Sequence, residues 1–176
     1  MKSLVIIPAR GGSRGLPNKN IKELNGKPLI HYTIEAARNV FDDSSIYVST
    51  DSKKIKKIAE ATGLKIPFLR PKNLAKDTSN IRDVILHAIE FYKLKNNEYP
   101  NFIVLLQPTS PLRNSNHIIE AIDLYNDKLD MVSSVNETNA NPYYVLFEEN
   151  KEGLLKKVKK ANFTRRQDCP KVWQYN

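Results

Sequence analysis

The sequence predicts an α/β domain built on a mainly parallel sheet with helices on both faces. Short runs rich in Ile, Val and Leu, with little polar alternation, are typical of strands that are buried on both sides. The segments between these runs repeat apolar residues at helical spacing. Regular alternation of strand and helix favours parallel strands joined by crossover helices, and in such sheets ligands bind beyond the carboxyl ends of the strands.

Four runs are expected to be strands of this sheet, and four segments carry an apolar stripe on one side of a helix. The expected strands are residues 4–7, 46–48, 102–106 and 131–135. The expected helices cover the apolar stripes in residues 29–37, 55–59, 81–92 and 118–125.

Local signals fix the expected helix ends. Pro28 fits the first turn of the first helix, and Gly63 fits the position just after the second. Ser79 and Ser115 fit N-caps, because a serine hydroxyl accepts a hydrogen bond from a free backbone N–H of the first turn.

The pattern changes after residue 135. Residues 136–142 are polar, and residues 143–148 and 154–158 are expected to form a β-hairpin around Gly153. The length of 176 residues fits one domain, since a chain of this size buries roughly 70% of its unfolded surface. We therefore expect residues 1–176 to form a single domain that includes this hairpin region.

The composition favours anionic partners. The chain has 28 Lys and Arg against 19 Asp and Glu, a net charge of +9. Residues 151–176 hold eight basic and two acidic residues and so supply six of these charges. A solvated surface is the simpler explanation for the lysines between 156 and 160. Nucleic-acid binding is not favoured, because no recognisable nucleic-acid module presents the charges.

Cysteine content and hydropathy restrict the compartment. Cys169 is the single cysteine, so an internal disulfide is excluded. No run of about 18 apolar residues and no signal-like segment indicates a membrane span or export. We expect a cytoplasmic protein that does not associate with membranes.

A glycine-rich basic loop follows the first predicted strand. It contains Gly11, Gly12 and Gly15 together with Arg10, Ser13, Arg14 and Lys19. Glycine lets a backbone approach an anion closely, and the cations add full charges, so the loop is typical of a polyphosphate site. The two common phosphate-loop patterns, G-x-x-x-x-G-K-[ST] and G-x-G-x-x-G, do not match this loop.

This loop and four later segments together resemble the acylneuraminate cytidylyltransferases, which join a nine-carbon sugar acid to CMP with CTP as donor. The later segments are VSTDS at 48–52, FLRP and LAKDTS between 68 and 79, LLQPTSPLR at 105–113, and RRQD at 165–168. The resemblance implies a Rossmann-like nucleotidyltransferase fold of three layers. It also implies that residues 136–176 form an arm that packs against a second subunit in a homodimer.

The resemblance assigns residues to CTP. The triphosphate positions are Arg10, Gly11, Gly12, Ser13, Arg14 and Lys19. Arg10 and Lys19 are the first candidates for catalysis, since cations stabilise the charge that accumulates during nucleotidyl transfer. Arg14 has a simpler alternative as an exposed side chain that only steers the ligand.

Three further positions match the nucleoside. Asn20 matches a ribose position, whereas Arg70 and Ser79 match positions at the cytosine. The alternatives are a turn residue for Asn20, a surface ion pair for Arg70 and a helix cap for Ser79. Asp51 is expected to cap the following helix, with metal or nucleotide binding as the alternative.

The resemblance also assigns the sugar acid. Its implied positions are Gln107, Arg165, Arg166 and Gln167. A carboxylate substrate calls for a bidentate guanidinium, which lysine does not provide. Spacing does not tell which of the two arginines faces the site, since neighbours on a strand point to opposite sides.

Nucleotidyl transfer of this kind normally uses Mg²⁺, held by carboxylate and phosphate oxygens. Thr109 stands where related sugar-acid cytidylyltransferases carry an aspartate, and the family's metal-binding aspartates come from a later segment. The resemblance therefore implies metal ligands beyond Asn176. We expect the chain to be a truncated form, with a natural short variant of impaired catalysis as the alternative, and in either case to bind CTP but turn over slowly or not at all.

Two other functions stay open. A paralogue acting on legionaminic or pseudaminic acid is the alternative within the class, since these sugars differ only in their substituents. A non-catalytic nucleotide-binding module is the alternative outside it. The three histidines fall in helical patterns at unrelated spacings, so they are expected to be packing or surface residues.

Overall fold

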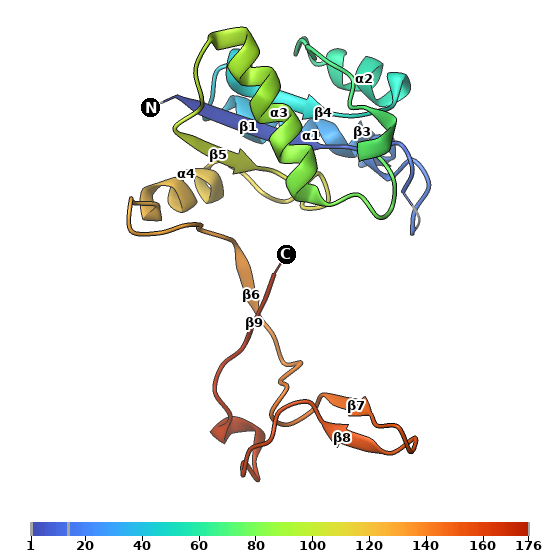
Figure 1. Ribbon diagram of the computed structural model, residues 1–176, viewed down its shortest axis with the longest axis vertical. Helices are drawn as coiled ribbons and strands as arrows, with labels where there is room; N and C mark the ends of the chain where they lie inside the picture. The colour runs from blue at the N-terminus through green and yellow to red at the C-terminus, as the bar shows by residue number, and fades with distance from the viewer. Residues whose placement is uncertain (1, 14, 176) are drawn as a thin grey trace. The chain divides into compact units, whose positions relative to one another are not determined.

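The computed structural model describes residues 2–13 and 15–175 (Figure 1). Contacts within the chain divide it into two compact units, Met1–Ile122 and Asp123–Asn176. In the described part of the chain, every helix is too short or too polar to cross a lipid bilayer.

A parallel sheet lies at the centre of the first unit. Its order is β4 (Ile46–Ser49), β1 (Ser3–Pro8), β5 (Phe102–Leu105), and both neighbours of β1 run parallel to it. Ile6 of β1 stands opposite Tyr47 on one side and Leu105 on the other. Three of the four expected strands and the parallel sheet are confirmed.

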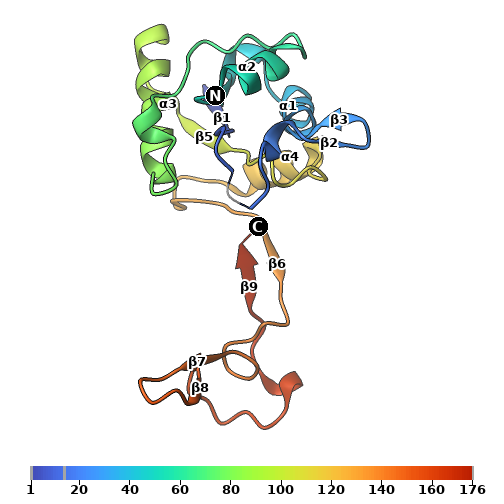
Figure 2. The same ribbon diagram turned by 90° about the vertical axis from the view of Figure 1, so that its right-hand side faces the viewer.

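Helices cover both faces of this sheet (Figure 2). Because successive side chains of a strand point to opposite faces, β1 serves two cores. Val5 and Ile7 pack into a cluster with α1, α2 and α4, whereas Leu4 and Ile6 pack with α3. All four side chains are completely buried. The helices are α1 (Leu29–Arg38), α2 (Lys53–Glu60), α3 (Ile81–Asn96) and α4 (Ser115–Leu124).

Short elements connect the layers. They are η1 (Lys19–Ile21), β2 (Glu23–Leu24), β3 (Lys27–Pro28), η2 (Asp43–Ser45) and η3 (Lys72–Leu74). Gly63 has a positive φ of 87° just after α2, a conformation that glycine adopts at no steric cost. The predicted place of Gly63, directly after the capping residue of that helix, is wrong by one residue, because Ala61 is the C-cap and Thr62 lies between them.

Asparagines, not the expected serines, cap α3 and α4. The Oδ1 atom of Asn80 accepts a hydrogen bond from a backbone N–H of the first turn of α3, at 2.9 Å. Asn114 Oδ1 does the same for α4, at 3.2 Å. The N-cap predictions for Ser79 and Ser115 are wrong by one residue. Asn and Ser are equally good caps, so sequence preference does not choose between adjacent ones.

The second unit contains two antiparallel strand pairs. β6 (Val135–Glu137) pairs with β9 (Trp173–Tyr175), and β7 (Phe147–Glu149) pairs with β8 (Leu155–Lys157). The predicted hairpin around Gly153 is confirmed, with shorter strands than expected. The prediction of a buried strand at 131–135 is wrong, because residues 131–134 form no strand and Val135 is an exposed residue of β6.

Asn141 joins the ends of the second unit's central loop. Its Nδ2 atom donates a hydrogen bond to the carbonyl oxygen of Pro170 at 2.9 Å, and its Oδ1 accepts one from the N–H of Tyr143 at 2.9 Å. The side chain is buried, with 8% of its surface exposed. This one amide therefore links the segment before β7 to the segment that leads into β9.

Candidate functional site

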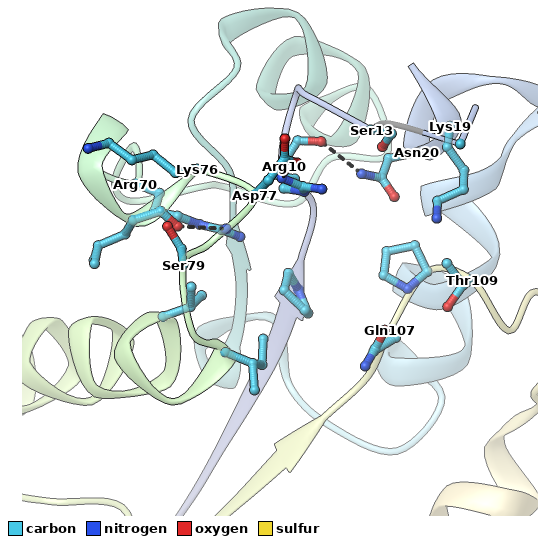
Figure 3. A pocket seen from close by; sticks show the side chains of 16 residues that line it. Arg10, Ser13, Lys19, Asn20, Arg70, Lys76, Asp77, Ser79, Gln107 and Thr109 are labelled. Atoms are coloured by element: carbon cyan, nitrogen blue, oxygen red, sulfur yellow. Dashed lines mark hydrogen bonds and ion pairs between the residues drawn. The ribbon is translucent and has the colours of Figure 1, made fainter. Parts of the chain in front are cut away.

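A polar pocket of about 440 Å³ lies at the carboxyl ends of β1 and β5 (Figure 3). The loops after these strands meet there with the segment that precedes α3. Parallel strands bring such loops to one edge of a sheet, where ligands are expected to bind in an α/β fold. The lining residues are Pro8, Arg10, Ser13, Gly15, Lys19, Asn20, Arg70, Leu74, Lys76, Asp77, Ser79, Ile81, Val84, Gln107, Pro108 and Thr109.

The pocket wall is strongly basic. Four cationic side chains line it against one carboxylate among the described residues, an excess of three positive charges; they are Arg10, Lys19, Arg70 and Lys76 against Asp77. Concentrated positive charge in a concave surface attracts polyanions. The pocket is therefore suited to a phosphate-bearing ligand.

Arg70 is buried beneath the pocket, with 5% of its surface exposed. Its Nε donates to Ser49 Oγ at 3.0 Å and its Nη2 donates to the Ser49 carbonyl oxygen. Nη1 reaches the Leu74 carbonyl oxygen at 3.5 Å. Burial lowers the pKa of this guanidinium, while the charge of Asp51 raises it and that of Arg10 lowers it. The alternative of a surface ion pair for Arg70 is wrong.

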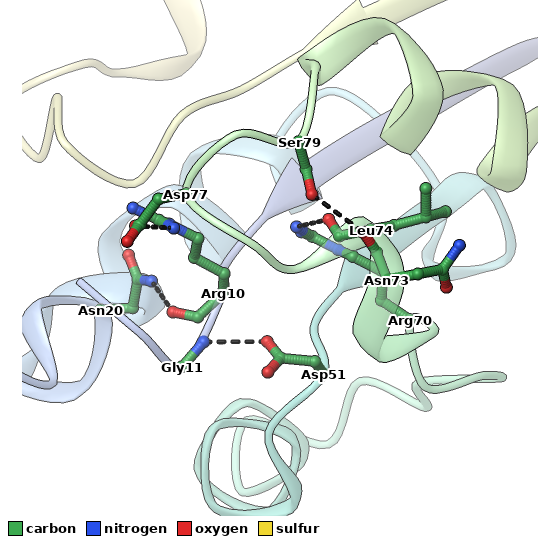
Figure 4. Close-up of polar contacts among 9 residues, drawn as sticks. All are labelled: Arg10, Gly11, Asn20, Asp51, Arg70, Asn73, Leu74, Asp77 and Ser79. Atoms are coloured by element: carbon green, nitrogen blue, oxygen red, sulfur yellow. Dashed lines mark hydrogen bonds and ion pairs between the residues drawn. The ribbon is translucent and has the colours of Figure 1, made fainter. Parts of the chain in front are cut away.

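Arg10 forms an ion pair with Asp77 across the pocket, and each side chain is about one-third exposed (Figure 4). The backbone of Arg10 is fixed as well, because Asn20 Nδ2 donates to its carbonyl oxygen at 3.1 Å. Asn20 is buried, with 5% exposed. Asn20 therefore both closes the glycine-rich loop and lines the pocket.

The residues that follow β4 lie so close to position 11 that they favour glycine there. Its N–H donates to Asp51 Oδ1 at 2.9 Å, and a Cβ at this position would stand 3.1 Å from Ser52 Cβ. Neither Gly11 nor Gly12 has a positive φ, so neither needs a left-handed backbone. A side chain at Gly12 would meet no atom of the described residues within 4 Å. The loop is therefore packed at Gly11 and unpacked at Gly12, and neither glycine is among the residues that line the pocket.

The expected capping role of Asp51 is wrong. Ser52 caps α2 instead, with its Oγ accepting a hydrogen bond from the N–H of Ile55 at 3.4 Å. Because Asp51 is turned toward Gly11, its carboxylate is not available to the first turn of the helix. Adjacent Asp and Ser are both good caps, and tertiary contacts decide between them.

Ser79 and Gln107 also lie at the pocket. Ser79 Oγ donates to the carbonyl oxygen of Asn73 at 3.1 Å, which fixes the turn before α3. The Gln107 carbonyl oxygen accepts a hydrogen bond from Arg113 Nη2. Burial lowers the pKa of Arg113. Sequence reasoning did not assign Arg113 a role, although it ends the same LLQPTSPLR segment.

The other expected site residues are considered apart from the pocket's described lining. Arg14 is outside the described residues. Arg165, Arg166 and Gln167 belong to the second unit, where all three are exposed. Arg165 pairs there with Asp168 through Nε and Nη2, at 2.8 and 2.9 Å. Arg166 and Gln167 lie in a 3-10 turn, so the strand geometry considered for the two arginines does not apply.

The described residues do not form a metal site. Among residues 2–13 and 15–175, no three His, Cys, Asp or Glu side chains gather in a way that suits a metal ion. The carboxylate at the pocket, Asp77, is engaged with Arg10. A donor set of one paired carboxylate does not fit a protein-held Mg²⁺.

The histidines have structural partners, as expected. His31 Nε2 lies 2.7 Å from the carbonyl oxygen of Ile58, and His117 Nδ1 accepts from the N–H of Asn114 at 3.3 Å. The His87 ring packs edge-on against Phe68, and burial lowers its pKa.

The fold defines the class of protein. A solved structure of CMP:2-keto-3-deoxy-manno-octonic acid synthetase complexed with CTP matches the chain with a TM-score of 0.66. The match covers 100% of this chain and 72% of that one at 19% sequence identity. The fold is therefore that of the α/β nucleotidyltransferases.

Sequence similarity then gives the family. The family model described as cytidylyltransferase matches residues 4–174, and the chain belongs to this family. The N-acylneuraminate cytidylyltransferase of Escherichia coli is 46% identical over 140 residues, which are 78% of this chain and 32% of that protein. The chain thus spans about a third of the length of this relative.

Relatives with other sugar names are also similar. The CMP-N,N'-diacetyllegionaminic acid synthase of Legionella pneumophila is 36% identical over 89% of this chain and 67% of its own length. The pseudaminic acid cytidylyltransferase of Campylobacter jejuni is 42% identical over 71% of this chain and 53% of its own length.

The contacts of Arg70 predict that lysine will not replace it. In Arg70→Lys, one ammonium group replaces a guanidinium that donates hydrogen bonds to both the side-chain and the backbone oxygen of Ser49. The buried charge of the lysine therefore makes fewer directed hydrogen bonds. We expect the free energy of unfolding to fall by about 2 kcal/mol. Urea titration followed by far-UV circular dichroism measures this loss, since α1, α2 and α3 all lie in the first unit. The exposed Arg82→Lys is the matched control, with an expected change within about 0.5 kcal/mol. Equal stability of the two variants would contradict the structural role.

Proposed function

We propose that the chain binds CTP in the basic pocket and transfers its CMP group to a nine-carbon 2-keto sugar acid. In this reaction a sugar hydroxyl attacks the α-phosphorus, and the bond to the departing pyrophosphate breaks in line with the attack. The observation that carries the proposal is the meeting of Arg10, Lys19 and Arg70 in one pocket at the strand ends of a cytidylyltransferase-family fold.

The triphosphate is proposed to lie along the glycine-rich loop. Arg10, Ser13 and Lys19 line the pocket on this side, and open space at Gly12 admits a phosphate close to the backbone. In the absence of ligand, Asp77 is the anionic partner of Arg10. A phosphate group would take over this role, with Arg10 and Lys19 neutralising the charge that builds up on the leaving pyrophosphate.

The nucleoside is proposed to lie toward Arg70, Asn20 and Ser79. Arg70 is already held by Ser49 and Leu74, so little side-chain freedom remains to be lost when a base binds. Leu74, Ile81 and Val84 give this end of the pocket an apolar wall, which suits the face of a base ring.

The sugar acid is proposed to be N-acetylneuraminic acid or a close relative. Gln107 lines the pocket, and Arg165, Arg166 and Gln167 stay candidates for its carboxylate. The E. coli relative carries the N-acylneuraminate name, and its identity over the aligned region is 46%. The legionaminic and pseudaminic names of the other relatives keep those acids as alternatives.

We include Mg²⁺ in the proposal because of the chemistry of the reaction, since the described residues do not form a site for it. A bound Mg²⁺ neutralises phosphate charge in nucleotidyl transfer. In the described part of the chain, Asp77 is the one carboxylate that lines the pocket. The ion would therefore have to be held by phosphate oxygens of CTP and by carboxylates other than those of the described pocket residues.

We also propose that residues 1–176 act as one cytoplasmic domain and that residues 136–176 form a homodimer arm. The second unit exposes large apolar side chains that a monomer would leave in water. The exposed fractions are 49% for Phe147, 72% for Leu155, 59% for Trp173 and 68% for Tyr175.

Removing either of two pocket cations is expected to weaken CTP binding. Each of Arg10→Ala and Lys19→Ala loses a charge-assisted contact to a phosphate, so the Kd for CTP rises about 10- to 100-fold in calorimetry. Lys22→Ala is the matched control, because Lys22 is an exposed lysine near η1 that does not line the pocket. Changes below twofold in both pocket variants would argue against the phosphate site.

A panel of sugar acids tests the substrate. With CTP and Mg²⁺, pyrophosphate release is expected to be slow, since the described residues of the pocket offer no carboxylate cluster for the metal. Among the three acids, release is expected to be fastest with N-acetylneuraminic acid. Faster release with legionaminic or pseudaminic acid would move the assignment to that sugar. Tight CTP binding without release from any of the three acids would favour a non-catalytic nucleotide-binding module.

If residues 136–176 form a homodimer arm, the chain is expected to self-associate. In Trp173→Lys a charge replaces a large exposed apolar side chain of β9, so the variant is expected to sediment as a monomer at concentrations where the unmodified chain is a dimer. Leu94→Lys is the control, because Leu94 of α3 is 83% exposed in the first unit. A monomeric unmodified chain, or a Trp173→Lys dimer of equal affinity, would refute the arm.

A further inference from the structure

Asp51 contacts the glycine-rich loop without lining the pocket. It follows Thr50 at the end of β4, and its Oδ1 accepts the hydrogen bond from the N–H of Gly11 (Figure 4). Asp51 is not among the residues that line the pocket. Its carboxylate therefore reaches the glycine-rich loop from the side of the sheet, and the ligand would approach that loop from the pocket.

The fit between the loop and the end of β4 is close. A Cβ on Gly11 would stand 3.1 Å from Ser52 Cβ and 3.7 Å from Asp51 Oδ2, nearer than most side-chain contacts allow in the first case. The absence of a side chain at Gly11 thus permits the hydrogen bond from its N–H to Asp51. Loop position and Asp51 are consequently coupled by both contact and hydrogen bonding.

Asp51 also balances the buried charge of Arg70. The oxygens that accept from this guanidinium, in Ser49 and Leu74, are uncharged. The charge of Arg10 disfavours the cationic form of Arg70, and the charge of Asp51 favours it. A buried cation is costly without compensating charge, so the charge of Asp51 offsets part of the cost of burying Arg70.

We propose that Asp51 is a positioning residue that holds the glycine-rich loop in its nucleotide-binding arrangement. Its effect on CTP affinity rests on the proposed function, whereas its hold on Gly11 does not.

Two variants separate the hydrogen bond from the charge. Asp51→Asn retains an oxygen that accepts from Gly11 but removes the charge near Arg70, and Asp51→Ala removes both. Ser52→Ala is the matched control, since it loses the cap of α2 but keeps the Cβ that packs on Gly11. All variants are made in the full chain, with circular dichroism to verify folding.

The first measurement is amide hydrogen exchange at Gly11 without ligand. We expect exchange to accelerate about tenfold or more in Asp51→Ala, because the acceptor is lost, and to stay within about twofold of the unmodified chain in Asp51→Asn and Ser52→Ala. Unchanged exchange in Asp51→Ala would overturn the hold on the loop.

The second measurement is the Kd for CTP by calorimetry. We expect it to rise about tenfold or more in Asp51→Ala and about threefold in Asp51→Asn, with Ser52→Ala unchanged. Unchanged affinity in folded Asp51→Ala would overturn the positioning role. If Asp51→Ala does not fold, Asp51→Asn decides, and unchanged affinity there overturns the charge contribution.

The two measurements also distinguish this inference from the proposed function. If the unmodified chain binds no CTP while Gly11 exchange follows Asp51, the nucleotide assignment fails and the hold of Asp51 on the loop is supported. If CTP binds but neither the Gly11 exchange rate nor the Kd for CTP depends on Asp51, the nucleotide assignment stands and the positioning role is overturned.

Discussion

The end of β4 is the constraint on which the pocket depends. The carbonyl oxygen of Ser49 accepts hydrogen bonds from the N–H of Ala9 at 2.9 Å and from the guanidinium of Arg70. The next carbonyl, of Thr50, accepts from the N–H of Arg70 at 2.7 Å. Two segments far apart in sequence are thus fixed to the same two residues. Because Ser49 and Thr50 are completely buried, water does not compete for these bonds.

An arginine side chain binds the backbone at the carboxyl ends of both outer strands, β4 and β5. Arg70 donates to the carbonyl oxygen of Ser49, the last residue of β4, and Arg113 donates to that of Gln107 after β5. Each guanidinium donates to a backbone carbonyl at a strand end, and Arg70 is buried whereas Arg113 is partly exposed. Some of the basic residues of the chain therefore stabilise the fold, in addition to any role in binding anions.

The sequence predicted what repeats along the chain and missed what depends on distant contacts. The buried strands, the helices and the hairpin at Gly153 follow from hydrophobic periodicity and turn chemistry. The partner of Asp51 lies 40 residues away in Gly11, so no local pattern indicates it. Residues 131–134 have the composition of a strand but no partner strand in their own unit, and composition alone does not supply one.

The amide of Asn141 determines where the second unit tolerates changes in length. Because it joins the segment before β7 to Pro170, this loop is closed at its base independently of the hairpin tip. Insertions or deletions at the turn around Gly153 would leave that closure intact, since exposed loop tips carry few contacts. The hairpin can therefore change in length at little cost, whereas replacing the asparagine would remove the closure.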